Sequence, residues 1–171
     1  MVGTKTNLNG ENILMQINDI LFKIKTALSL ESKMIQEAYA LVEYDMSKER
    51  LENILKKHQD KGYVEATFEE LGLFLDGLVI LKRGPSDKTQ DEDEVVELTN
   101  NLILKKIRVA MELKEAELVI IFALAEVTLT KRHIGSLFRK EGGKNFKVCS
   151  DELLLAFLDG LDEFYYDGEE V

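Results

Sequence analysis

The sequence is poor in several residue types that define particular classes of protein. It has one cysteine, Cys149, one proline and no tryptophan among its 171 residues. A single thiol forms neither an internal disulfide nor a zinc site built from several cysteines. This use of cysteine favours a reducing compartment, so we expect a cytoplasmic protein.

Long apolar runs are also missing. Residues 118–125 form one of the longest, and this run is far shorter than the roughly 20 residues needed to cross a bilayer. Residues 1–17 lack the basic segment and continuous apolar stretch that mark a signal peptide. We therefore expect no signal peptide and no membrane partner.

Positive charge is scarce in the chain as a whole but not in all of its parts. Its 22 Lys and Arg residues stand against 32 Asp and Glu, a formal charge of −10, which argues against a general nucleic-acid binder. Residues 101–149, however, hold 10 basic and 5 acidic residues and carry +5, whereas residues 85–100 carry −5 and residues 150–171 carry −8. Nucleic acid therefore stays open as an alternative partner.

The strongest pattern in the sequence is an internal duplication. Residues 18–84 align with residues 101–167 at a constant shift of 83 without a gap. Of the 67 aligned residue pairs, 20 are identical, whereas unrelated sequences would give about four. The longest identical block, FLDGL, occupies residues 74–78 and 157–161. The chain thus contains the same unit twice.

Each unit is predicted to form four helices of about 11 to 16 residues. In the first helix of unit one, Ile20, Ile24 and Ala27 follow the spacing of one buried stripe. Ser47 and Thr67 are suited to cap the third and fourth helices, as are Thr130 and Ser150 in unit two. Strand-like alternation is absent.

These patterns predict an all-α fold in which two homologous four-helix units follow one another and pack with pseudo-two-fold symmetry. The predicted boundaries are an N-terminal extension at residues 1–17 and a first repeat at 18–84. An acidic, flexible linker follows at residues 85–100. The second repeat covers residues 101–167, and an acidic tail covers 168–171.

Several of these blocks resemble a known family. The chain resembles the YehS-like family of small bacterial tandem-repeat proteins, which carry a domain of unknown function. The residues that carry the resemblance are the two FLDGL blocks, the opening segment at residues 100–108 and the stretches 138–141 and 145–151. The resemblance covers nearly all of residues 18–166. It implies a soluble, helical, cytoplasmic bacterial protein, with no established reaction, ligand or catalytic residue.

The pairs Asp76-Gly77 and Asp159-Gly160 form the first candidate polar site. Each pair places a carboxylate and a helix-disfavoured glycine inside an otherwise apolar fourth helix. The structural explanation is that glycine permits close helix packing while aspartate caps a neighbouring helix or pairs with a lysine of the first helix. In the functional alternative, the two carboxylates meet across the pseudo-dyad and carry out acid–base chemistry.

A basic segment of unit two forms the second candidate site, a nucleic-acid face. Its second and third helices resemble the outline of a helix-turn-helix, whose recognition helix would begin with basic residues. The ordinary explanation is a tight turn in a helical bundle, with the acidic fourth helix and tail neutralising the basic charge. The residues of this face are Lys131, Arg132, His133, Arg139 and Lys140.

No catalytic residues, cofactor site or metal site are predicted. His58 and His133 occupy different repeat positions and have no carboxylates at metal-binding spacing, and Cys149 is expected to be a buried apolar residue. The leading hypothesis is a non-enzymatic protein-interaction or regulatory module with an unknown protein partner. Nucleic-acid binding is the alternative, and an enzyme that uses Asp76 and Asp159 is the third hypothesis. The sequence leaves open whether the chain forms homo-oligomers.

Overall fold

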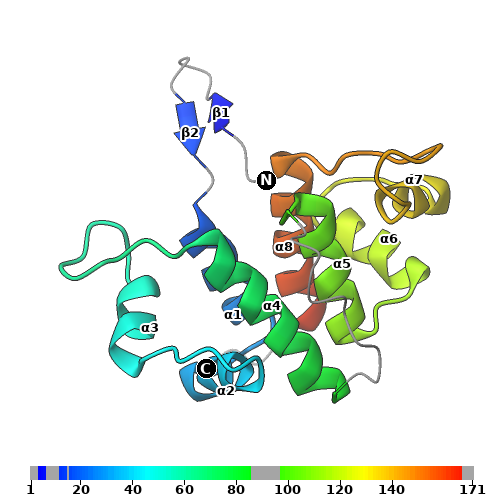
Figure 1. Ribbon diagram of the computed structural model, residues 1–171. Coiled ribbons are helices and arrows are strands. Elements are labelled where there is room, and N and C mark those ends of the chain that lie inside the picture. Colours follow the sequence, from blue (N-terminus) through cyan, green and yellow to red (C-terminus); the bar gives the residue numbers. More distant parts are fainter. Residues whose placement is uncertain (1–3, 7–11, 15, 86–96, 167–171) are drawn as a thin grey trace.

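The computed structural model describes residues 4–6, 12–14, 16–85 and 97–166. Its described part contains eight helices in two groups of four, as the sequence predicts, and a pair of short strands (Figure 1). Unit one consists of α1 (Ile17–Ala27), α2 (Ser32–Leu41), α3 (Lys48–Ile54) and α4 (Phe68–Arg83). Unit two consists of α5 (Asn100–Met111), α6 (Glu115–Leu124), α7 (Lys131–Leu137) and α8 (Asp151–Tyr165).

Two local features differ from the sequence prediction. The N-terminal extension contains a short antiparallel pair, β1 (Thr4–Thr6) and β2 (Asn12–Leu14), where no strand was predicted. The helices α3 and α7 have only 7 residues each, so the predicted minimum of about 11 is wrong for them. Most of the predicted acidic linker, residues 86–96, and the whole predicted acidic tail, residues 168–171, lie outside the described residues.

The two units are interleaved rather than stacked as separate bundles. Within each unit the fourth helix packs on the second, α4 on α2 and α8 on α6. The first helix, however, packs mainly on the fourth helix of the other unit, α1 on α8 and α5 on α4. These contacts are equivalent under the repeat, which confirms the pseudo-two-fold arrangement. Neither unit completes its core alone.

Aromatic side chains occupy equivalent positions in the two halves of the core. Tyr39 and Phe74 lie with ring centroids 6.0 Å apart in unit one, and their counterparts Phe122 and Phe157 lie 5.6 Å apart in unit two. All four side chains are fully buried. The tilted ring pairs join the second helix to the fourth in each unit and add to the apolar burial that stabilises the core.

An asparagine at the start of each first helix holds the loop that follows the third helix. Asn18 donates to the carbonyl oxygens of Ile54 and Val64 at 3.0 and 2.8 Å and accepts from the Ala66 N–H at 2.9 Å. Asn101 makes the same three bonds at the positions shifted by 83, at 2.8 to 2.9 Å. These bonds satisfy loop backbone groups, so α3 and α7 end without continuing as helices.

Candidate functional site

The glycines of both FLDGL blocks lie at close helix contacts. A Cβ atom at Gly77 would overlap the carbonyl oxygen of Ala38, and a Cβ at Gly160 would overlap that of Ile121. Ala38 and Ile121 are themselves equivalent in the repeat. Glycine is therefore needed at both positions because the backbone of the fourth helix approaches the backbone of the second.

The aspartates of these blocks pair with lysines of the first helices, across the two units. Lys106 Nζ of α5 lies 2.7 Å from Asp76 Oδ1 of α4, and Lys23 Nζ of α1 lies 2.8 Å from Asp159 Oδ1 of α8. Among the described residues, no contact joins the two carboxylates to each other. The arrangement thus matches a structural lysine pairing and offers no acid–base pair.

The basic candidates lie at the two ends of α7. Lys131 and Arg132 begin α7, whereas Arg139 and Lys140 follow its end, and the 7 residues of this helix are about 10 Å long. His133 accepts a hydrogen bond from the Thr130 N–H through Nδ1 at 3.4 Å, which completes the N-terminal cap of α7. These five side chains are exposed, and no ion pair within the described residues neutralises them.

The outer face of α6 carries an apolar stripe that was not predicted as a site. Ile120 and Leu124 are 51% and 45% exposed, and Ala116 and Ala123 beside them are also exposed. We call these four residues the α6 stripe. The long apolar run of residues 118–125 could have indicated this stripe. A helix that is apolar on every face but packs on its neighbours with only one side exposes apolar residues on the other side.

Unit one provides an internal comparison for the α6 stripe. At the equivalent positions of α2, Lys33 and Glu37 replace Ala116 and Ile120, while alanine and leucine are retained at the other two. The helices α2 and α6 bury the same inner face against α4 and α8. The apolar outer face is therefore not required by the fold, since α2 keeps the same packing with charged residues there.

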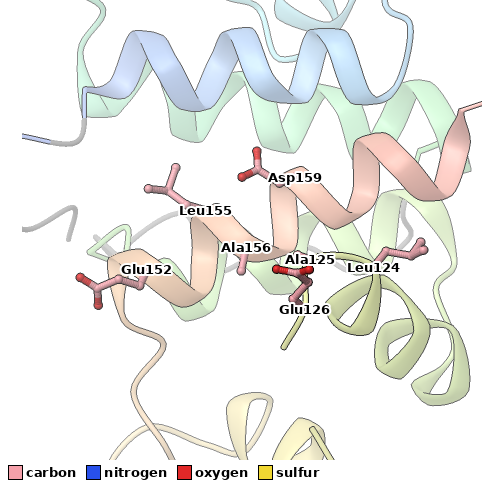
Figure 2. A pocket seen from close by; sticks show the side chains of 7 residues that line it. All are labelled: Leu124, Ala125, Glu126, Glu152, Leu155, Ala156 and Asp159. Atoms are coloured by element: carbon pink, nitrogen blue, oxygen red, sulfur yellow. The ribbon is translucent and has the colours of Figure 1, made fainter. Parts of the chain in front are cut away.

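A shallow groove of about 440 Å³ adjoins the stripe and shares Leu124 with it. Figure 2 shows Asp159 and Leu155 on the side of α8 that faces α1, with Glu126 on the opposite side near the end of α6. The groove therefore lies between α8 and the end of α6. Its lining residues are Leu124, Ala125, Glu126, Glu152, Leu155, Ala156 and Asp159.

A polar cluster in unit one was also missed. Arg50 donates two hydrogen bonds of 2.7 Å to the carboxylate of Glu70, whose side chain is only 2% exposed. Tyr44 donates to the same carboxylate at 3.2 Å, and Tyr39 donates to the Glu70 carbonyl oxygen at 2.9 Å. The hydrogen bonds from Arg50 hold the pKa of Glu70 below its ordinary value.

This cluster has no counterpart in unit two. The positions of its four members are filled there by Phe122, Val127, His133 and Leu153. The whole hydrogen-bonded set is therefore replaced at once, mostly by apolar side chains. Because the same fold forms either way, the cluster stabilises unit one locally and is no requirement of the repeat.

Neither a reactive thiol nor a metal site is found in the described part of the chain. Cys149 is buried, and burial raises the pKa of its thiol to about 12, so the sulfur stays protonated near neutral pH. Within residues 16–85 and 97–166, histidine, cysteine and carboxylate side chains form no group of three able to hold a metal ion. No helix in these ranges is long and apolar enough to span a membrane.

Comparison with known proteins agrees with the duplicated helical units. The pattern of a family described as proteins of unknown function, DUF1456, matches twice, at residues 18–84 and 100–165. The chain belongs to the DUF1456 family. Uncharacterized protein YehS of Escherichia coli (strain K12) is 29% identical to this DUF1456 chain over 147 residues, which cover 86% of the chain and 94% of YehS. No solved structure matches the chain.

Proposed function

We propose that this DUF1456 protein is a non-enzymatic interaction module that binds a partner protein through the α6 stripe. The observation that carries the proposal is that Ile120 and Leu124 are exposed together, whereas unit one has Glu37 beside the exposed Leu41 at the equivalent positions. Exposed apolar patches of this kind mark interaction surfaces because water contact with them is unfavourable. A cytoplasmic location stays a prediction from the single cysteine.

A non-enzymatic role is supported by the state of the groups that were candidates for chemistry. Asp76 and Asp159 are each held by a lysine at 2.7 to 2.8 Å, and the thiol of Cys149 is buried and protonated. None of the three is left as a free base or nucleophile.

The proposal is tested by photo-crosslinking in cells at matched positions of the two units. We expect p-benzoylphenylalanine in place of Ile120 to crosslink a discrete partner protein, and the same residue in place of Glu37 to give no such product. Purified partner should then bind wild type at least about tenfold more tightly than Leu124→Glu, because a buried charge in an apolar contact is strongly unfavourable.

Three outcomes would contradict this proposal. They are no product at position 120, the same products at positions 120 and 37, and a product that joins two copies of the chain. The last result would assign the stripe to self-association instead of a different partner. Circular dichroism of Leu124→Glu must show wild-type helix content, and Leu41→Glu in unit one is the matched control.

Nucleic-acid binding is the second candidate function, and one observation favours it. Lys131, Arg132, Arg139 and Lys140 are exposed and have no ion pairs within the described residues, which include α8 but not the acidic tail. Such cations release counterions when they bind phosphates.

Fluorescence anisotropy of a labelled DNA duplex tests this candidate. If it is correct, wild type binds at about 50 mM salt with a dissociation constant near 10⁻⁵ M, and binding weakens steeply as salt rises. Replacing all four residues with alanine should abolish it. An unchanged anisotropy of the duplex at low salt would rule the candidate out.

A further inference from the structure

The groove beside the α6 stripe has both apolar and acidic walls. Leu124, Ala125, Leu155 and Ala156 supply the apolar surface, and carboxylates stand at three points around it. Because Leu124 belongs to the stripe and to the groove, the two form one continuous surface. A ligand on the stripe therefore meets the carboxylates as well.

Two of these carboxylates form no ion pair in the part of the chain that the structure describes. Asp159 pairs with Lys23, but Glu126 and Glu152 are exposed and form no ion pair within the described residues. In water these two charges are well solvated, and they attract a cation that approaches along the groove. The surface thus combines an apolar stripe with unneutralised negative charge.

The backbone geometry at position 126 favours glycine and gives no reason for a carboxylate. Glu126 follows the end of α6 with a φ of +62°, and its counterpart Glu43 follows α2 with a φ of +58°. Glycine is the favoured residue at such a left-handed position after a helix, because any Cβ is unfavourable there. Glutamate nevertheless occupies it in both units.

The acidic groups of the groove occur in both copies of the unit. Leu124, Glu126, Glu152 and Asp159 correspond at a shift of 83 to Leu41, Glu43, Glu69 and Asp76. The stripe differs between the copies, whereas this leucine and these three carboxylates are identical. Unit one thus keeps the acidic groups and Leu41 but has Lys33 and Glu37 in the stripe, so only unit two combines these groups with a wholly apolar stripe.

Two other occupants fit this surface poorly. A second copy packed by two-fold symmetry would bring two copies of this acidic groove together, and like charges repel. A metal ion needs several ligands together, and the described residues contain no such group. A partner with positive charge beside an apolar edge fits both halves of the surface.

We propose that the α6 stripe and the groove together bind an amphipathic helix of a partner protein. Leucine-like side chains of this helix contact Ile120, Leu124 and Leu155. Its lysine or arginine side chains pair with Glu126 and Glu152. This proposal rests on the proposed function, because it names the chemistry of the partner that docks on α6. Helices bind such grooves through apolar residues spaced three and four apart, and flanking charges set which partner is accepted.

Three synthetic peptides of about 18 residues, a length that gives five helical turns, test the proposal by fluorescence anisotropy with the full-length protein. The first is an amphipathic helix with a leucine edge flanked by lysines. The second has glutamate in place of every lysine, and the third has serine in place of every leucine. We expect the first peptide to bind at least about tenfold more tightly than either of the others.

Variants of the protein then assign the binding to the groove. The double variant Glu126→Gln, Glu152→Gln should weaken binding of the first peptide about tenfold, and added salt should reduce the difference. The matched control is Asp162→Asn with Glu163→Gln, which removes two exposed charges from the end of α8 and should leave binding unchanged. Glu126→Gly should weaken binding while raising the midpoint of thermal unfolding, which separates lost binding from lost folding.

The outcomes distinguish the failure of this proposal from the failure of the proposed function. If the lysine and glutamate peptides bind equally and Leu124→Glu abolishes both, the stripe is a docking surface but the charge assignment is wrong. If the control pair weakens binding as much as the groove pair, the attraction is general and the groove is not the site. If Leu124→Glu changes nothing, the stripe is not a docking surface, and both proposals fail.

Discussion

Replacing Gly160 with alanine is expected to lower the free energy of unfolding by about 3 kcal/mol, although alanine is the better helix former. The added Cβ would overlap the carbonyl oxygen of Ile121 and lie 3.2 Å from its Cγ2 atom. A backbone oxygen cannot rotate away as a side chain can, so α8 would have to move off α6. The buried contact of Phe157 with Phe122 would then loosen as well.

The repeat and a third glycine supply the controls. Gly77→Ala should be destabilising to a similar extent, because its Cβ would overlap the equivalent oxygen of Ala38. Gly72→Ala, in the same helix as Gly77, should instead raise stability by about 0.5 to 1 kcal/mol, since no atom lies within 4 Å of the added Cβ. Urea unfolding followed by circular dichroism measures all three. Equal stabilities for Gly72→Ala and Gly160→Ala would refute the packing explanation.

Removing Arg50 while Glu70 remains is expected to destabilise the protein by about 3 kcal/mol at neutral pH. In Arg50→Ala the carboxylate of Glu70 would stay buried at 2% exposure without its guanidinium partner. Tyr44 and the Thr67 N–H would still donate to it, at 3.2 and 3.0 Å. Two neutral donors do not replace a bidentate cation, so the charged carboxylate becomes unfavourable.

The pH dependence of this effect has a definite sign. In wild type the folded-state pKa of Glu70 is lowered, chiefly by its hydrogen bonds to Arg50. Its contribution to stability is thus present above the ordinary glutamate pKa of about 4.3 and is lost as the pH falls through the lower, folded-state value. In Arg50→Ala the main cause of the lowered pKa is removed, so the pKa of Glu70 lies above its wild-type value. The stability difference between the two proteins should therefore shrink as the pH falls below about 4.

Unit two indicates how to remove the cluster without this penalty. The combined variant Tyr39→Phe, Tyr44→Val, Arg50→His, Glu70→Leu installs the residues of unit two, and we expect it to lie within about 1 to 2 kcal/mol of wild type. Urea unfolding at several pH values should also show that the variant lacks the pH dependence of stability that Glu70 gives to wild type. A combined variant less stable than Arg50→Ala would mean that the cluster is needed for unit one to fold.

The sequence predicted the candidate sites unevenly. The pairing of aspartate with a lysine of a first helix was one of two structural explanations for Asp76 and Asp159, and this pairing is what the structure shows. The Arg50–Glu70 cluster was missed because its members lie 20 residues apart and no local pattern connects them. The α6 stripe was missed for a different reason: an apolar run indicates burial, and only exposed area distinguishes a buried face from an open one.

The sequence by itself determined the duplication, the helical character and most helix starts, because these depend on local spacing and on caps such as Thr67 with Glu70. Only the tertiary structure decided which fourth helix each first helix packs on. The stripes of α1 and α5 are nearly the same, as are the FLDGL faces of α4 and α8, so the apolar pattern fits either pairing. The observed packing of α1 on α8 and α5 on α4 places Lys23 beside Asp159 and Lys106 beside Asp76, and the buried residues of the two units form one continuous core.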